Sequence, residues 1–103
     1  MFELTYTQIM EERANKAAMT LDANSKVLQS LASFYTNLMT NPNFELKDRP
    51  MCKSAVADFL IQLQDYIYDT QMFSERAVTL SKITADRKSL VRLVTLLQKR
   101  EFY

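Results

Sequence analysis

Apolar side chains recur along the first forty residues in alternating steps of four and three. They form a seam through Met10, Ala14, Ala17, Leu21, Asn24, Leu28, Leu31, Tyr35 and Leu38, which only Asn24 interrupts. This heptad spacing is typical of a long amphipathic helix that packs along a second helix. A helix with one apolar stripe needs such a partner, because helix formation alone is only marginally favourable in water.

The expected ends of this first helix follow from local signals. Thr5 and Gln8 have the spacing of a capping box, and Leu4 and Ile9 bracket them as a hydrophobic staple would. At the other end, the residue that precedes Pro42 is biased out of the α-helical region of backbone conformation. The sequence therefore predicts a helix over about residues 6–40.

A second heptad pattern follows a short polar connection over residues 41–50, which contains both prolines of the chain. We expect Phe44 and Leu46 to fold back onto the end of the core, and Pro50 suits the first turn of a helix. The second seam runs through Val56, Phe59, Leu63, Tyr66, Thr70, Phe73, Ala77, Leu80, Thr84, Arg87, Val91 and Val94, with Leu60, Ile67, Ile83, Leu90 and Leu97 beside it. This pattern predicts a helix over about residues 51–99.

Two places could bend or break this second helix. Residues 69–70 and Thr84 could each cap a new helix start, although neither place contains proline or glycine. The predicted fold is a single all-α domain over residues 1–103, an antiparallel helical hairpin or coiled coil of two long helices. The apolar strip from Leu90 to Leu97 has no counterpart in the shorter first helix, so we expect hairpins to assemble into a larger bundle.

Composition narrows the chemistry that the chain can perform. The sequence contains no glycine and no histidine. It therefore has no glycine-rich phosphate loop, and it lacks both the commonest general base and a common metal ligand. Cys52 is the only cysteine, so no intrachain disulfide can form. We expect no enzymatic activity, no cofactor and no small-molecule substrate.

Three aspartates, Asp58, Asp65 and Asp69, can share one face of the second helix. Carboxylates are suitable ligands for Mg²⁺ and Ca²⁺, so a cation site is one interpretation. The other interpretation is a solvated acidic stripe. We favour the stripe and predict no metal site.

Charge is unevenly divided between the two parts of the chain. Residues 1–75 hold six basic and ten acidic side chains, whereas residues 76–103 hold seven basic and two acidic ones. The candidate basic surface comprises Arg87, Lys88, Arg92, Lys99 and Arg100. Such a surface suits either an acidic helical partner or an anionic membrane. Nucleic-acid binding is not expected, because no recognised nucleic-acid-binding fold or aromatic platform accompanies these residues.

The expected location is intracellular and cytoplasmic, with attachment to a membrane surface as the alternative. No run of about 18 apolar residues that could span a bilayer occurs in the sequence. The first ten residues contain Glu3 and no basic cluster, unlike a secretory signal. The lone cysteine also suits a reducing compartment.

The sequence resembles the long-helix, or stalk, region of fungal CorA-like magnesium-transporter proteins, which precedes their membrane segments. The similar residues are Leu28, Leu31, Phe34, Tyr35, Leu38 and Met39, then Phe44, Leu46, Cys52, Phe59, Gln62, Arg76 and Ala77, and the run from Lys82 to Val91. The resemblance implies a helical stalk without its channel. The Gly-Met-Asn triplet of the family and its spanning helices have no counterpart in this chain, so we do not expect transport.

The leading hypothesis for function is a non-enzymatic coiled-coil interaction protein that associates with its own copies or with a related full-length protein. The residues expected to carry the interaction are Leu80, Ile83, Leu90, Val91, Val94 and Leu97. A second hypothesis is a truncated duplicate that acts as a toxin or selfish element, like those of fungal spore killing. A third is peripheral membrane binding by the basic C-terminal helix.

Overall fold

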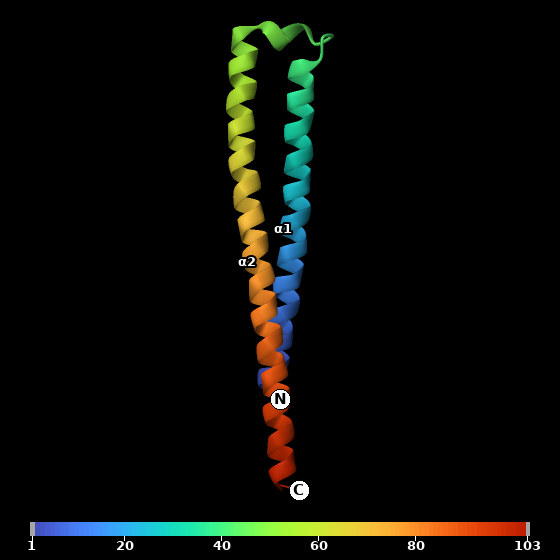
Figure 1. Cartoon of the computed structure of the whole chain (residues 1–103), viewed down its shortest axis with the longest axis vertical. Coiled ribbons are helices and arrows are strands. Elements are labelled where there is room, and N and C mark those ends of the chain that lie inside the picture. The colour runs from blue at the N-terminus through green and yellow to red at the C-terminus, as the bar shows by residue number, and fades with distance from the viewer. Residues whose placement is uncertain (1, 103) are drawn as a thin grey trace. The chain divides into compact units, whose positions relative to one another are not determined.

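The computed structural model describes residues 2–102, with side chains from residue 3 to residue 101. Helix α1 is Phe2–Thr40, the short 3₁₀ helix η1 is Glu45–Asp48, and helix α2 is Pro50–Phe102. Residues 2–102 contain no strand, and the two long helices are joined by the connection that holds η1 (Figure 1). The prediction of an all-α hairpin of two long helices is confirmed.

Helix α1 begins four residues earlier than predicted. Because it starts at Phe2, Thr5 lies within the helix and the expected capping-box start is wrong. The Thr7 hydroxyl donates to the carbonyl oxygens of Glu3 and Leu4, at 3.1 and 2.9 Å, so a helical turn already exists before it. The carboxylate of Glu3 in the first turn is favourable beside the positive end of the helix dipole. The end of α1 at Thr40 agrees with the prediction.

The connection uses local backbone hydrogen bonds to turn the chain. The Asn41 side chain accepts the backbone N–H of Asn43 at 2.9 Å, and the Asn41 carbonyl accepts the N–H of Phe44 at 3.1 Å. Phe44 is half-buried, as expected, whereas Leu46 is exposed, contrary to expectation. Helix α2 then begins at Pro50. Proline has no backbone N–H, and at the first position of a helix an N–H would have no partner within the helix.

Helix α2 is continuous through both places where a break was considered. The Thr70 hydroxyl donates to the carbonyl oxygen of Tyr66 at 2.6 Å. The Thr84 hydroxyl donates to the carbonyl oxygens of Leu80 and Ser81, at 2.8 and 2.9 Å. Both hydroxyls therefore bond back into the same helix instead of capping a new one. The helix ends at Phe102, slightly beyond the predicted end.

Two compact units make up the chain, and each contains a segment of α1 antiparallel to a segment of α2 (Figure 1). Unit 1 consists of Met1–Thr20 and Phe73–Tyr103, and unit 2 is Leu21–Met72. In both units the buried and half-buried positions recur in steps of three and four. We call these facing positions the inner seam.

The inner seam of unit 2 is mainly apolar. It contains Leu21, Ser25, Leu28, Ala32, Tyr35 and Met39 of α1, and Cys52, Val56, Leu60, Leu63, Ile67 and Thr70 of α2. The Tyr35 ring meets the Phe59 ring edge-on, with centroids 5.1 Å apart. The buried Ser25 hydroxyl accepts a hydrogen bond from the Gln29 side chain at 3.2 Å. Burial of these apolar side chains is the main favourable contribution to the stability of unit 2.

Half of the predicted seam positions are correct, and the other half lie one residue too early. Ala14 and Leu63 are buried as predicted, but Ala18 is buried instead of Ala17. In α2, Ile67 is 4% exposed while the predicted Tyr66 is 61% exposed. The same shift affects Asn24 and Leu31 in α1 and Phe73, Leu80, Arg87 and Val94 in α2. Small side chains at the seam let two helix backbones approach closely, so the largest apolar residue is not always the buried one.

We predict that Leu63→Ala lowers the free energy of unfolding by about 2–4 kcal/mol, because it leaves a cavity in the core of unit 2. Ile61→Ala is the matched control, since Ile61 lies on the same helix but is largely exposed. Its expected effect is below about 1 kcal/mol. Urea denaturation followed by circular dichroism measures both values. Equal losses from the two substitutions would contradict the assigned register of α2.

Candidate interaction surface

The inner seam of unit 1 consists mainly of small and polar side chains. It contains Leu4, Thr7, Glu11, Ala14 and Ala18 of α1, and Ser74, Ala77, Ser81, Thr84, Lys88, Val91 and Thr95 of α2. Among these residues Thr7, Ala14 and Ala18 are buried, and the others are half-buried. This composition is the reverse of a usual helical pair, in which the large apolar residues face inward.

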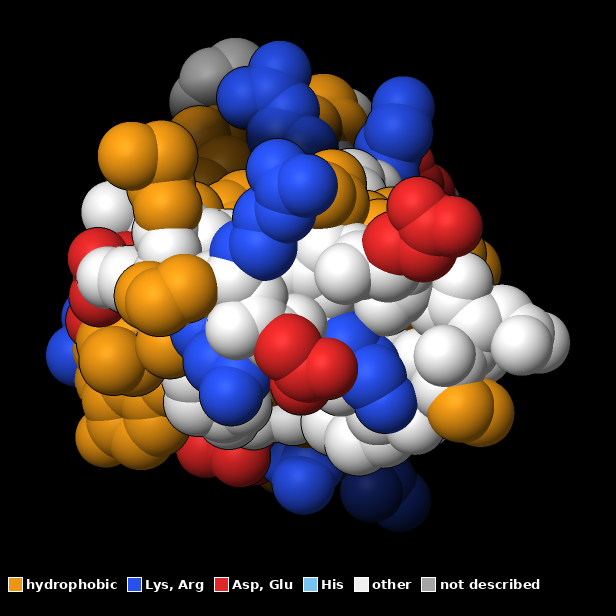
Figure 2. Space-filling view, turned by 90° about the horizontal axis from the view of Figure 1, so that it is seen from above, with side chains coloured by type: hydrophobic (Ala, Val, Ile, Leu, Met, Phe, Trp, Pro, Cys, Tyr) orange, Lys and Arg blue, Asp and Glu red, His pale blue; other side chains and the backbone are white. Residues whose placement is uncertain are grey.

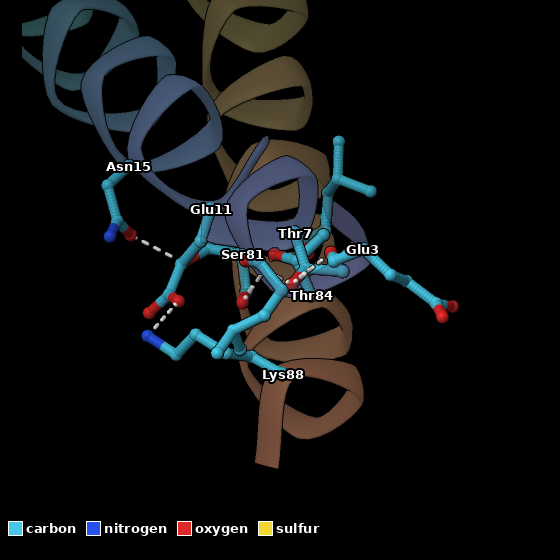
Figure 3. Close-up of polar contacts among 9 residues, drawn as sticks. Glu3, Thr7, Glu11, Asn15, Ser81, Thr84 and Lys88 are labelled. Atoms are coloured by element: carbon cyan, nitrogen blue, oxygen red, sulfur yellow. Dashed lines mark hydrogen bonds and ion pairs between the residues drawn. The ribbon is translucent and has the colours of Figure 1, made fainter. Parts of the chain in front are cut away.

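Hydrogen bonds join the two helices of unit 1 along this seam. The Ser74 hydroxyl donates to the carbonyl oxygen of Ala18 at 3.2 Å. The Ser81 hydroxyl donates to the side-chain oxygen of Asn15 (Figure 3). The Thr84 hydroxyl lies nearby and bonds within its own helix. Polar groups between the helices are therefore largely satisfied by short local contacts.

An ion pair between Glu11 and Lys88 occupies one layer of the same seam (Figure 3). The Lys88 ammonium nitrogen lies 2.6 Å from Oε2 of Glu11, and each side chain is 20% exposed. Oε2 of Glu11 is buried and accepts no hydrogen bond from the described residues, so its partner is the positive charge of Lys88. Loss of either residue would leave the other charge partly buried without its partner, which is unfavourable.

Many large apolar side chains of unit 1 are exposed on the outside of α2. Six of them belong to a stripe through Phe73, Arg76, Leu80, Ile83, Arg87, Leu90, Val94 and Leu97, which we call the outer stripe of unit 1, whereas Val78, Leu93 and Leu96 are exposed outside this stripe. Each member from Phe73 to Val94 precedes an inner-seam residue by one position, or by about 100° around the helix axis, and Leu97 continues the same spacing. Its six apolar members are 45–60% exposed. Helix α2 of unit 1 thus has two neighbouring heptad stripes: the inner seam packs against α1, and the outer stripe meets α1 through Arg87.

The outer stripe continues onto α1 of the same unit. Residues of α1 that precede inner-seam positions include Tyr6, which is exposed, and Met10, which is half-buried. The Arg87 guanidinium lies 3.4 Å from the Glu3 carboxylate, so the two helices meet on this side through an exposed ion pair. Figure 2 looks onto the end of the chain that holds the connection, where apolar and charged side chains lie intermingled at the surface.

Helix α2 extends beyond the first residue of α1 (Figure 1). An open groove lies at this place, between Glu3 of α1 and the apolar residues Leu90, Val91 and Val94 of α2. Thr95 and Gln98 complete its wall on the inner-seam side. Both heptad stripes of α2 therefore continue into a segment that α1 does not cover.

The predicted interaction residues fall into two groups. Leu80, Ile83, Leu90, Val94 and Leu97 lie together on the outer stripe, whereas Val91 is half-buried in the inner seam. The predicted basic residues also separate: Lys88 is in the inner-seam ion pair, Arg87 is on the outer stripe, and Arg92, Lys99 and Arg100 are exposed elsewhere. Sequence reasoning missed the Glu11–Lys88 pair. The signal for it in the sequence was that Glu11 in the first helix and Lys88 in the second have opposite charges and follow the steps of three and four of the two seams.

Two other findings bear on function. Among residues 2–102, no group of three or more histidine, cysteine, aspartate or glutamate side chains is arranged to hold a metal ion. Within the same range, neither helix has a segment that is apolar over enough of its length to cross a bilayer.

No protein-family model matches this sequence. Searches of curated proteins and of solved structures found no match either. The resemblance to the stalk of CorA-like transporters therefore stays a prediction, and functional inference depends on the two faces of α2 in unit 1.

We predict an interaction energy of about 1–2 kcal/mol between Glu11 and Lys88, because the pair is partly shielded from water. A double-mutant cycle with Glu11→Gln and Lys88→Met, measured by urea denaturation, gives this value. The control cycle uses Asp22→Asn and Lys26→Met, since that pair is also close, at 3.1 Å, but mostly exposed. Its expected coupling is about 0.3–0.5 kcal/mol. Equal coupling energies from the two cycles would show that the inner-seam position of Glu11 and Lys88 does not strengthen their interaction.

Proposed function

We propose that the protein is a non-enzymatic helical interaction protein that binds a helical partner through the outer stripe of unit 1. One observation carries this proposal: small and polar residues face inward between α1 and α2, while large apolar residues face outward. Leu90, for example, is 60% exposed, whereas Ser74 and Ser81 occupy the inner seam. Contiguous apolar surface of this kind is typical of a protein-interaction site.

The energetics favour burial of this stripe. Complete burial of a leucine, isoleucine or valine side chain contributes about 1.5–3 kcal/mol, so burial of the half that is exposed contributes about 1 kcal/mol each. Leu80, Ile83, Leu90, Val94 and Leu97 together therefore offer about 5 kcal/mol before the entropy of association is subtracted. The flanking stripe of α1 adds Tyr6, an aromatic residue of the kind enriched at interfaces.

The spacing of the stripe indicates what kind of partner fits it. Its members follow steps of three and four, which is the pattern that one helix presents to another in a coiled coil or bundle. A helix with two such stripes about 100° apart has the geometry of a bundle member with two neighbours. The partner class is therefore an amphipathic helical chain, either a further copy of this protein or a related helical protein.

A membrane surface is the second candidate, and the uncovered end of α2 supports it. Beyond α1, the helix combines Val94 and Leu97 with the exposed basic residues Arg92, Lys99 and Arg100. Basic amphipathic helices of this composition bind anionic lipid surfaces. The helical partner is favoured because Arg76 and Arg87 lie within the stripe itself, where a helical partner can supply acidic side chains and the apolar interior of a bilayer cannot.

We predict that Leu90→Asp combined with Val94→Asp converts the associated protein to a smaller species, because two charges would have to be buried at the interface. Size-exclusion chromatography at matched concentrations measures the change. The control combines Ser89→Asp and Leu96→Asp, which add the same charge to the same helix turns at exposed positions off the outer stripe. This control is expected to elute like the unaltered protein.

An unchanged elution volume of the Leu90 and Val94 variant would refute this surface as the interface. Sedimentation with anionic phospholipid vesicles distinguishes the second candidate. If the unaltered protein is monomeric but pellets with the vesicles at low salt, the membrane reading replaces the helical partner.

A further inference from the structure

Both helices of unit 1 present a second stripe on the same side of the pair. On α2 this is the outer stripe. On α1 it is the set of residues that precede inner-seam positions, which we call the α1 stripe: Glu3, Tyr6, Met10, Arg13 and Ala17. Because the helices are antiparallel, a step of one residue toward the N-terminus turns both stripes to the same side. The ion pair between Arg87 and Glu3, one residue from each stripe, agrees with this placement. We call the two stripes together the outer face of unit 1.

The charges of this outer face complement each other. The outer stripe of α2 carries Arg76 and Arg87 and no acidic residue, whereas Glu3 is the acidic residue of the α1 stripe. The Arg87 and Glu3 side chains lie 3.4 Å apart and remain 65% and 62% exposed. A guanidinium has five N–H donors, so Arg87 can bind a second carboxylate while it keeps the first. A partner with a carboxylate at the height of Arg87 therefore suits this face.

The contacts of the inner seam show which residues of the two helices lie at the same height. The Ser81 hydroxyl bonds to the Asn15 side chain. Nine residues from this contact, counted in opposite directions along the two antiparallel helices, are Tyr6 and Leu90. Tyr6 and Leu90 are 57% and 60% exposed. The outer face thus has an aromatic and an aliphatic side chain, one on each helix, at the same height.

We propose that the outer face of unit 1 binds the outer face of unit 1 in a second copy of this chain, with α2 of each copy antiparallel to α1 of the other. This step rests on the proposed function and names its partner. Each Arg87 then lies between Glu3 of its own chain and Glu3 of the second copy. The four charges alternate in sign around one layer of a four-helix arrangement, which has the symmetry of an isologous dimer.

Apolar side chains meet in the same arrangement. Tyr6 of the second copy lies over Leu90 and Val94, which line the open groove between the two helices. Ala17 of the second copy lies within one residue of the height of Leu80, so a short side chain faces a long one. Aromatic residues are enriched at protein interfaces, and alternation of short and long side chains permits close packing.

A second pair of opposite charges lies at the edge of this contact. Asp86 precedes Arg87 by one residue, so it lies on the edge of the outer stripe that is remote from the inner seam. Arg13 of the second copy lies within one helical turn of the height of Asp86, on the same edge. Both side chains are exposed in the single chain. Opposite charges at facing edges set the orientation of helical partners.

The opposite orientation of the second copy is less favourable. It places α2 of one copy against α2 of the other, so that Leu80 of each copy faces Leu90 of the other when the two stripes are aligned end to end. Arg87 then faces Ile83, at the far end of the unit from Glu3 of the second copy. Its guanidinium would lose water without gaining an acidic partner.

The outer face of unit 1 is large enough for a dimer. Residues 73–97 of α2 and residues 3–17 of α1 form strips about 37 Å and about 22 Å long, each about 10 Å wide. The face therefore covers about 600 Å² on each copy, or about 1,200 Å² in total. This area reaches the lower end of the range for stable protein interfaces.

A mixture of two charge variants tests the proposal. Glu3→Arg alone and Arg87→Glu alone are each expected to raise the dimer dissociation constant about tenfold or more, because each brings like charges together twice between the copies. In an equimolar mixture, opposite charges meet again between the copies, while like charges remain within each chain. We expect the mixture to dimerise with a constant within about threefold of that of the unaltered protein. Sedimentation equilibrium measures these constants.

The matched control mixes Glu75→Arg with Lys82→Glu. These substitutions change the net charge by the same amounts at exposed positions of α2 outside the outer face. Each control variant and their mixture are expected to stay within about threefold of the unaltered protein. Circular dichroism shows whether every variant is folded. The proposal is refuted if the Glu3 and Arg87 mixture associates no better than its components, or if the controls behave in the same way.

Cysteine pairing gives an independent readout of orientation. In a Cys52→Ser background, Tyr6→Cys and Leu90→Cys are placed in separate chains, and oxidation of the mixture is expected to yield a covalent dimer. A mixture of Leu80→Cys and Leu90→Cys chains is expected to yield none, because these positions lie about 15 Å apart along the helix axis in the proposed arrangement. The reverse result would show that α2 lies against α2 and would overturn the proposal.

The outcomes distinguish this inference from the proposed function. If Leu90→Asp with Val94→Asp reduces the size of the associated species but the charge mixture does not dimerise, the outer stripe remains the interface and this arrangement is refuted. A protein that is monomeric at every concentration refutes the second copy as the partner.

Discussion

The contact between α1 and α2 in unit 1 determines which side chains lie on the surface of this unit. Because Ala14, Ala18, Ser74 and Ser81 occupy the inner seam, the helices meet through short side chains and the larger apolar ones are excluded from it. The large apolar residues that the inner seam excludes lie on the outside of α2, mostly one position before an inner-seam residue. An inner seam that buries little apolar area contributes little stability, so unit 1 has much to gain from a partner.

Unit 2 differs from unit 1 because its inner seam buries large apolar side chains. Its inner seam contains Leu63 and Ile67, which are almost completely buried, and an edge-on contact between Tyr35 and Phe59. Its polar side, where Gln29, Gln64 and Gln71 line an open groove, has the composition of a solvated surface. The two units therefore differ in composition: the inner seam of unit 2 contains the larger apolar side chains, whereas that of unit 1 consists mainly of small and polar ones.

The sequence predicted the fold well because its main signals are strong and local. Absence of glycine, the position of Pro50 and the heptad spacing were sufficient for two helices and one connection. The exact seam was harder to predict, because hydrophobicity ranks Leu80 and Phe73 above Ser81 and Ser74, whereas close helix contact favours the small residues. Thr70 and Thr84 were ambiguous for a similar reason: a threonine hydroxyl can cap a helix or bond back into it, and the sequence does not decide between them.

We propose that the outer stripe of unit 1 binds an amphipathic helical chain, and a second copy of this protein supplies such a chain. Multi-angle light scattering of the unaltered protein, measured over a wide range of concentrations, shows whether two copies associate. We expect a molar mass that rises to about 24 kDa, twice the 12.0 kDa of one chain, and then stays there. A mass of 12.0 kDa at every concentration would contradict it.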